Sequence, residues 1–175
     1  MTRTVIVWLA LGFGLGRLPK APGTFGSLLG IVWFVALSYL SSLSLFLAAV
    51  SVSFFLGVWI CTQAELILKQ HDPGCIVIDE IVALPIAGLG WVLWYLQSGG
   101  GDTRVLQHLD WGSGLWLISI FALFRFFDIA KPWPVGISQK LDRGWGVMTD
   151  DLLAGIYVAL LSYSVRWLYA MSGIG

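Results

Sequence analysis

Two pairs of adjacent carboxylates, Asp79-Glu80 and Asp150-Asp151, each stand directly before a long apolar run. A helix starting at each run would place the pair at its N-terminus, where the helix dipole favours negative charge by about 0.3–1 kcal/mol. Capping of this kind needs only one oxygen-bearing side chain, whereas paired ionisable groups at the edge of hydrocarbon are costly and usually mark a function. We therefore interpret both pairs as parts of a chemical site and keep helix capping as the alternative.

The residue types in these pairs indicate the kind of ion they would bind. If the pairs faced each other across a bundle, their charges would repel each other unless a cation lay between them. Carboxylate oxygens without His or Cys suit a hard ion, so we expect Mg²⁺ first and Mn²⁺ second. The four side chains therefore predict a site for one or two metal ions.

A third acidic residue, Asp128, lies three positions from both Arg125 and Lys131. On a helix the three side chains share one face. One interpretation is a self-neutralised cluster at a helix end; the other makes Asp128 a further metal ligand and leaves Arg125 and Lys131 to bind an anion. The prolines of Lys131-Pro132-Trp133-Pro134 must end the helix at this point.

Other residues could contact a phosphate. The segment Pro22–Ser27 would deliver Thr24 or Ser27 to the N-terminus of an apolar helix, where free N–H groups favour an anion. Lys20 precedes this segment and would help to neutralise the anion. His71, in a predicted His-Asp-Pro-Gly turn, would be a general acid or a phosphate contact, the alternative being a surface histidine without a role.

The composition is that of a membrane protein. Hydrophobic residues make up 58% of the 175 residues and charged residues only 11%, against about 25% charged in soluble domains. The formal net charge of zero offers no basic footprint for nucleic acid, and no protein partner is implied. The length fits one domain, residues 1–175.

Uncharged runs predict an all-α membrane bundle with about five transmembrane helices. No charged residue occurs from Ala21 to Ala64, and a helix of that length would span about 66 Å, roughly two crossings. Val5–Phe13 is too short to cross and is expected to be an interfacial or re-entrant helix. The predicted spans are Thr24–Leu40, Leu45–Ala64, Ile81–Gln97, Trp111–Phe127 and Leu152–Tyr169.

With five crossings, counting alone puts residues 17–26, 65–80 and 125–151 on one side of the membrane. Eight of the ten Lys and Arg residues then share that side, and only Arg104 and Arg166 lie opposite. The positive-inside rule makes the side that carries these segments cytoplasmic. Acidic residues accumulate there too, which this rule does not explain.

Four blocks of the sequence are similar to the phosphatidylglycerophosphatase A family of bacterial inner-membrane enzymes. The blocks are FGLGRLPKAPGTFGSLLG, HDPGCIVIDEIV, FRFFDIAKPWP and GVMTDDLLAG. The resemblance implies Mg²⁺-dependent removal of the terminal phosphate of phosphatidylglycerophosphate at the cytoplasmic face. It also implies functional positions, namely the acidic residues Asp72, Asp79, Glu80, Asp128, Asp150 and Asp151 together with His71, Lys131 and Thr24.

The residues alone favour metal-dependent chemistry on an anionic lipid headgroup. We expect Asp79, Glu80, Asp128, Asp150 and Asp151 to bind Mg²⁺ and Lys20, Thr24, Arg125 and Lys131 to contact a phospholipid substrate drawn from the bilayer. Hydrolysis would proceed by water attack or through an aspartyl-phosphate. The alternatives are another metal-dependent lipid-headgroup enzyme and a carboxylate-based ion transporter, although a transporter would place its acids near the middle of the membrane.

Overall fold

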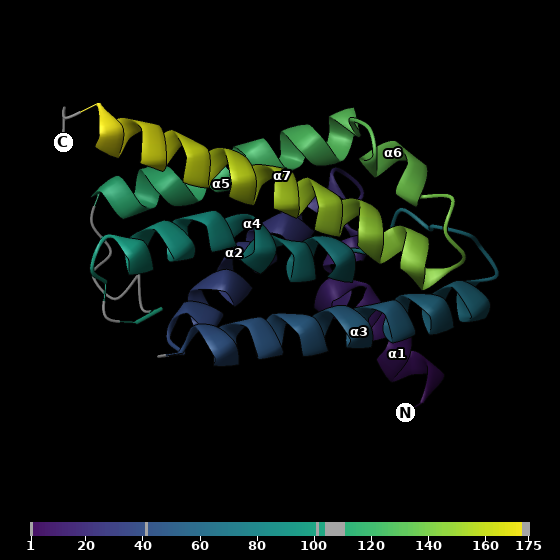
Figure 1. The fold of residues 1–175 in the computed structure, drawn as a ribbon. Helices are drawn as coiled ribbons and strands as arrows, with labels where there is room; N and C mark the ends of the chain where they lie inside the picture. Colours follow the sequence, from purple (N-terminus) through teal and green to yellow (C-terminus); the bar gives the residue numbers. More distant parts are fainter. Residues whose placement is uncertain (1, 41, 101, 104–110, 173–175) are drawn as a thin grey trace.

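The computed structural model describes residues 2–40, 42–100, 102–103 and 111–172, and within these ranges all regular secondary structure is helical (Figure 1). This confirms the predicted all-α class. Residues 104–110, which include Arg104 of the predicted opposite side, lie outside the described part. The elements in chain order are α1 (Arg3–Ala10), η1 (Gly12–Arg17), α2 (Pro22–Ser38), α3 (Leu43–Leu68), α4 (Ile78–Gln97), α5 (Trp111–Ala130), α6 (Val135–Ser138) and α7 (Gly144–Met171).

Four of these helices, α3, α4, α5 and α7, are long and apolar enough to cross a membrane. The remaining predicted span, Thr24–Leu40, corresponds to α2, which is apolar but has 17 residues, about 25 Å of helix. That is shorter than a hydrocarbon core of about 30 Å. The predicted polytopic bundle is therefore confirmed with four full-length helices and one short one.

The helix boundaries place the two acidic pairs differently from the prediction. Asp79 and Glu80 lie in the first turn of α4, as expected. Asp150 and Asp151, however, are not at a helix start, because α7 already begins at Gly144. Helix capping therefore does not account for this second pair.

The predicted short N-terminal helix is present as α1 followed by the 3₁₀ helix η1. Left-handed Phe13 (φ 61°) and Gly14 (φ 102°) turn the chain between the two halves of η1. The backbone N–H of Val77 donates to the Ala10 carbonyl at 3.0 Å, so this N-terminal segment is attached to the start of α4.

Helix α4 is the centre of the bundle and lies between α2 and α7. Within an 18-residue apolar stretch of α4, 61% of the residues are buried, against 17–28% in the corresponding stretches of the other three long helices. Small residues allow this close packing: a Cβ added at Gly90 would lie 2.0 Å from the Ala159 carbonyl oxygen of α7. The backbones of α4 and α7 therefore touch directly.

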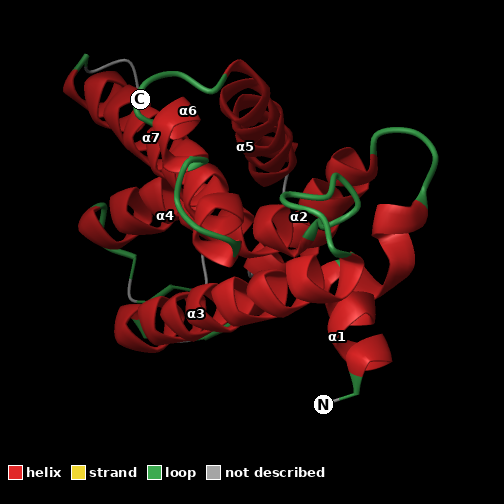
Figure 2. Cartoon of the chain, turned by 90° about the vertical axis from the view of Figure 1, so that its right-hand side faces the viewer, coloured by secondary structure: helices red, strands yellow, loops and turns green. Residues whose placement is uncertain are grey.

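The connections that carry the sequence motifs gather at one end of the bundle. Figure 1 shows the α3–α4 connection, α6 and the start of α7 at the right, and the C-terminus at the left. Figure 2 looks onto this right-hand end, which we call the site end. This agrees with the prediction from span counting that the connections carrying the motifs lie on the same side of the membrane.

We expect Gly90→Ala to destabilise the protein relative to Gly114→Ala. Both substitutions gain helix propensity, about 1 kcal/mol, but only at Gly90 does the new methyl group meet backbone, since nothing lies within 4 Å of a Cβ at Gly114. Overpacking should cost Gly90→Ala about 1–3 kcal/mol. Thermal unfolding of both variants in the same detergent measures the difference, and equal midpoints would contradict direct α4–α7 backbone contact.

Candidate active site

Three carboxylates converge at the site end, between α4 and α7. Asp79 and Glu80 of α4 and Asp151 of α7 each offer an oxygen, and these oxygens all lie within 4.8 Å of one another. Glu80 is 8% and Asp151 3% exposed. We call these three residues the carboxylate cluster.

Two oxygens of the cluster have no partner in the part of the chain described here. Glu80 Oε2 and Asp151 Oδ2 are buried without a hydrogen bond. A buried, unpaired carboxylate oxygen is costly, and neighbouring negative charges increase that cost. An all-oxygen donor set of this kind fits a hard divalent cation, Mg²⁺ or Mn²⁺.

The two other predicted metal ligands lie at the edge of the cluster, each paired with a cation. Arg125 Nη1 contacts Asp128 Oδ2 at 2.7 Å and Glu80 Oε1 at 3.4 Å. Lys131 Nζ contacts Asp150 Oδ2 at 2.5 Å. Arg125 and Lys131 thus contact three of the five carboxylates at this site, and a metal-binding role for Asp128 and Asp150 stays a prediction.

Lys131 directly follows α5 and stays charged at neutral pH. Its partial burial lowers the pKa, but the hydrogen bond from Lys131 to Asp150 and the charges of Asp150, Asp151 and Asp128 raise it by more, so that the pKa lies above the ordinary lysine value. Lys131 is therefore a positively charged group at the edge of the carboxylate cluster.

The N-terminus of α2 reaches the cluster because it carries glycines. A Cβ at Gly23 would lie 2.1 Å from Glu80 Oε1, and one at Gly26 would lie 2.7 Å from Glu80 Oε2. Ser27 Oγ donates to the Gly23 carbonyl at 2.9 Å and accepts from Arg125 Nη1 at 3.4 Å. Thr24 is half-buried in the same first turn. The anion-favouring end of α2 therefore lies beside Glu80 and Arg125.

Lys20 and His71, two further predicted site residues, are not part of this contact network in the described structure. Lys20 is exposed in the connection before α2. The His71 side chain is 65% exposed, and its Nδ1 lies 2.9 Å from Glu65 Oε1. Their predicted roles in phosphate binding and acid catalysis are untested by these contacts.

Two residues that hold the site loops were missed in the sequence. Glu65, 6% exposed, accepts hydrogen bonds from His71 and from the backbone N–H of Asp72. Tyr157 donates to the Trp133 carbonyl at 2.6 Å and so fixes the segment that follows Lys131. The available signal for Glu65 was its place within the apolar helical pattern, one turn after Cys61.

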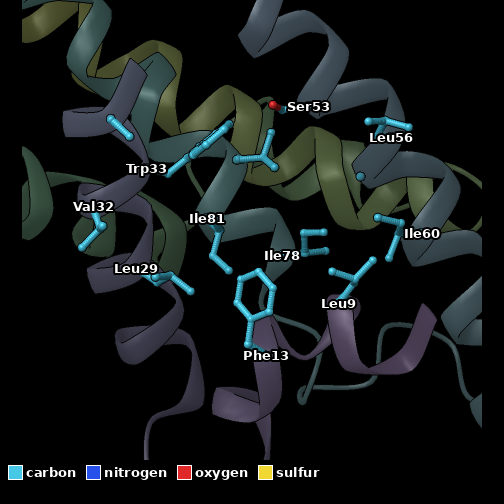
Figure 3. A pocket seen from close by; sticks show the side chains of 13 residues that line it. Leu9, Phe13, Leu29, Val32, Trp33, Ser53, Leu56, Ile60, Ile78 and Ile81 are labelled. Atoms are coloured by element: carbon cyan, nitrogen blue, oxygen red, sulfur yellow. The ribbon is translucent and has the colours of Figure 1, made fainter. Parts of the chain in front are cut away.

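A cavity of about 310 Å³ lies beside the first turns of α4, between α2, α3 and the N-terminal segment (Figure 3). Ile78 and Ile81 point into it, and Phe13 and Trp33 line other walls. Side chains at these positions leave α4 in a different direction from Asp79 and Glu80. The hydroxyl of Ser53 is already donated to the Ala49 carbonyl, so this cavity offers no polar chemistry.

Comparisons with known proteins identify a family and relatives that cover most of the chain. The family model described as phosphatidylglycerophosphatase A matches residues 8–166. Phosphatidylglycerophosphatase A of Haemophilus influenzae is 36% identical over 91% of this chain and 87% of its own length; that of Escherichia coli is 32% identical over 90% and 81%. A putative phosphatidylinositol-3-phosphatase of Bacteroides thetaiotaomicron is 36% identical over 92% and 93%. No solved structure matches the chain.

We expect Arg125→Met to lower the free energy of unfolding by about 1–3 kcal/mol, because it leaves the carboxylates of Glu80 and Asp128 without their cation. The measurement is thermal unfolding in EDTA-containing detergent buffer. Lys140→Met, at an exposed site, is the matched control and should stay within about 0.5 kcal/mol of wild type. If both variants were equally stable, the Arg125 contacts would contribute nothing to the fold.

Proposed function

The chain belongs to the phosphatidylglycerophosphatase A family and is a phosphoric monoester hydrolase; from this premise we propose that it converts phosphatidylglycerophosphate to phosphatidylglycerol and phosphate. The observation that carries the proposal is the carboxylate cluster with cations beside it. The carboxylates would bind a metal ion and the cations would bind the phosphate, so one site would hold both groups that hydrolysis of a phosphate monoester requires.

We further propose that the reaction requires Mg²⁺, held by Asp79, Glu80 and Asp151, with Asp128 or Asp150 completing the set. When bound, the ion would supply polarisation of the phosphoryl group and an acidified water. Mn²⁺ has the same preference for oxygen ligands and should substitute. The orphaned oxygens of Glu80 and Asp151 support this assignment.

The protein's own residues bind and orient the phosphate. A monoester carries a charge of about −1.5 to −2 if it resembles a phosphorylated side chain. Arg125 and Lys131 would neutralise this charge, and the first turn of α2, with Thr24, would donate N–H groups to a phosphoryl oxygen. Lys20, in the exposed connection before α2, would attract the anionic headgroup to the site.

The names of the relatives refer to two different phosphorylated lipid headgroups. Two relatives are named for phosphatidylglycerophosphate and one, as putative, for phosphatidylinositol 3-phosphate. Both lipids carry a phosphate monoester on an alcohol of the headgroup, so the site chemistry would serve either. The matching family model favours the first, and the second becomes a comparison substrate in the test.

We place the site end at the cytoplasmic face of a bacterial inner membrane. Eight of the ten Lys and Arg residues fall on this side when the predicted spans are counted, the asymmetry expected of a cytoplasmic face. The cations of the site itself, Arg125 and Lys131, contribute to that excess. A lipid substrate would reach the site from the surrounding leaflet.

Purified protein should release phosphate from phosphatidylglycerophosphate in mixed micelles with Mg²⁺ and not with EDTA. Turnover of phosphatidylinositol 3-phosphate should be slower, and Asp79→Asn or Asp151→Asn should lower activity by at least about 100-fold, since even outer-shell partners of metal ligands cost about 10–100-fold. Asp142→Asn, at an exposed carboxylate on the same side, is the control.

Full activity in EDTA would contradict the metal requirement. If phosphatidylinositol 3-phosphate were hydrolysed faster than phosphatidylglycerophosphate, the inositol lipid would be the preferred substrate. Wild-type rates in Asp79→Asn and Asp151→Asn would remove the carboxylate cluster from the active site.

A further inference from the structure

The last turn of α3 buries a carboxylate that the proposed chemistry has not used. Glu65 is 6% exposed, and its Oε1 accepts two hydrogen bonds, from His71 Nδ1 at 2.9 Å and from the backbone N–H of Asp72 at 2.7 Å. Both donors follow Glu65 by six or seven residues, so the chain must fold back over the end of its own helix. One oxygen thus fixes a side chain and a backbone group of the same turn.

The backbone of this turn is held in an uncommon conformation. Lys69 (φ 55°) and Asp72 (φ 44°) are both left-handed residues with side chains. This conformation is uncommon for lysine and less so for aspartate, and it persists where surrounding contacts determine it. The two hydrogen bonds to Glu65 are contacts of this kind, because they tie His71 and Asp72 to the last turn of α3.

The two hydrogen bonds satisfy only one oxygen of the Glu65 carboxylate. Its second oxygen, Oε2, is buried without a partner in the described part of the chain, which is a cost to folding. A cavity of about 240 Å³ beside it is lined by His71, Lys69 and Arg143. A buried carboxylate that is only half satisfied yet holds a histidine indicates a functional role.

The end of α3 that carries Glu65 packs against the two helices that supply the carboxylate cluster. The backbone N–H of Gly144, at the start of α7, donates to Thr62 Oγ1 of α3 at 3.3 Å. Ala64, directly before Glu65, shares a buried apolar cluster with Val82 of α4 and Met148 of α7. The last turn of α3 therefore lies at the same end of the bundle as Asp79, Glu80 and Asp151.

We propose that Glu65 is a positioning residue that orients His71 as the proton donor to the leaving group. The proposal rests on the proposed phosphatase function. With Nδ1 hydrogen-bonded to Glu65, the imidazole presents Nε2 away from the carboxylate, and this fixed orientation is what a carboxylate partner gives a catalytic histidine.

The proton balance of the step is complete. The bond from phosphorus to the headgroup oxygen breaks, the bond from phosphorus to the water oxygen forms, and Nε2 gives its proton to the departing alkoxide. The proton released by the attacking water returns to the imidazole through solvent, which the 65% exposure of the His71 side chain permits.

A double-mutant cycle on kcat tests this coupling with phosphatidylglycerophosphate in mixed micelles. Loss of a general acid costs about 10²-fold or more, so His71→Ala should lower kcat about 100-fold. Glu65→Ala should lower it about 10-fold or more, with the half-maximal Mg²⁺ concentration unchanged. Because both changes disable one unit, the double variant should be no slower than His71→Ala alone.

Two further measurements separate positioning from a merely structural role. Glu65→Gln keeps an acceptor oxygen for both hydrogen bonds and should retain kcat within a few-fold of wild type, even if Glu65→Ala does not fold. With 4-nitrophenyl phosphate, whose leaving group needs no proton, His71→Ala should lose little activity. Gln70→Ala, an exposed neighbour in the same turn, is the matched control and should behave as wild type.

Multiplying losses in the double variant would overturn the proposal, as would a Glu65→Gln variant as slow as His71→Ala. A raised Mg²⁺ requirement in Glu65→Ala would instead make Glu65 part of the metal site. Failure of the wild-type protein to release phosphate from any monoester would refute the proposed function itself, and with it this step.

Discussion

The main physical constraint on this structure is the repulsion among carboxylates that lie together where α4 packs against α7. Glu80 and Asp151 are buried there beside the half-buried Asp79, and their negative charges repel one another. Arg125 and Lys131 offset only part of that charge. Packing of α4 between α2 and α7 holds the carboxylates together despite this repulsion. A divalent cation would neutralise the remaining negative charge.

Close backbone approach is what creates this geometry. Gly23 and Gly26 let the start of α2 touch the Glu80 carboxylate, and Gly90 lets α4 touch α7. In an apolar bundle, small residues at helix contacts permit the backbones to pack directly. The same contacts that hold the bundle together therefore set the distances among the acids and between the acids and the anion-favouring end of α2.

The sequence predicted much of this arrangement from simple physical constraints. The lengths of the uncharged runs located the long helices. Counting these helices as membrane crossings placed the motifs at one end of the bundle. The sequence could not tell which acids converge, because that depends on how α4 and α7 rotate against each other. It also placed the start of the last helix at Leu152, since Asp150-Asp151 looked like a boundary, whereas α7 runs through them from Gly144. The burial of Glu65 depends on a turn folding back over α3, which no local pattern encodes.

We expect Asp79, Glu80 and Asp151 to bind one divalent cation together. The direct measurement is anomalous diffraction from crystals of the protein soaked in Mn²⁺. We expect an anomalous peak within coordination distance of oxygens from all three side chains, and we expect excess Mg²⁺ to remove it. A crystal with full Mn²⁺ access and no peak at these carboxylates, or a peak elsewhere in the bundle, would contradict it.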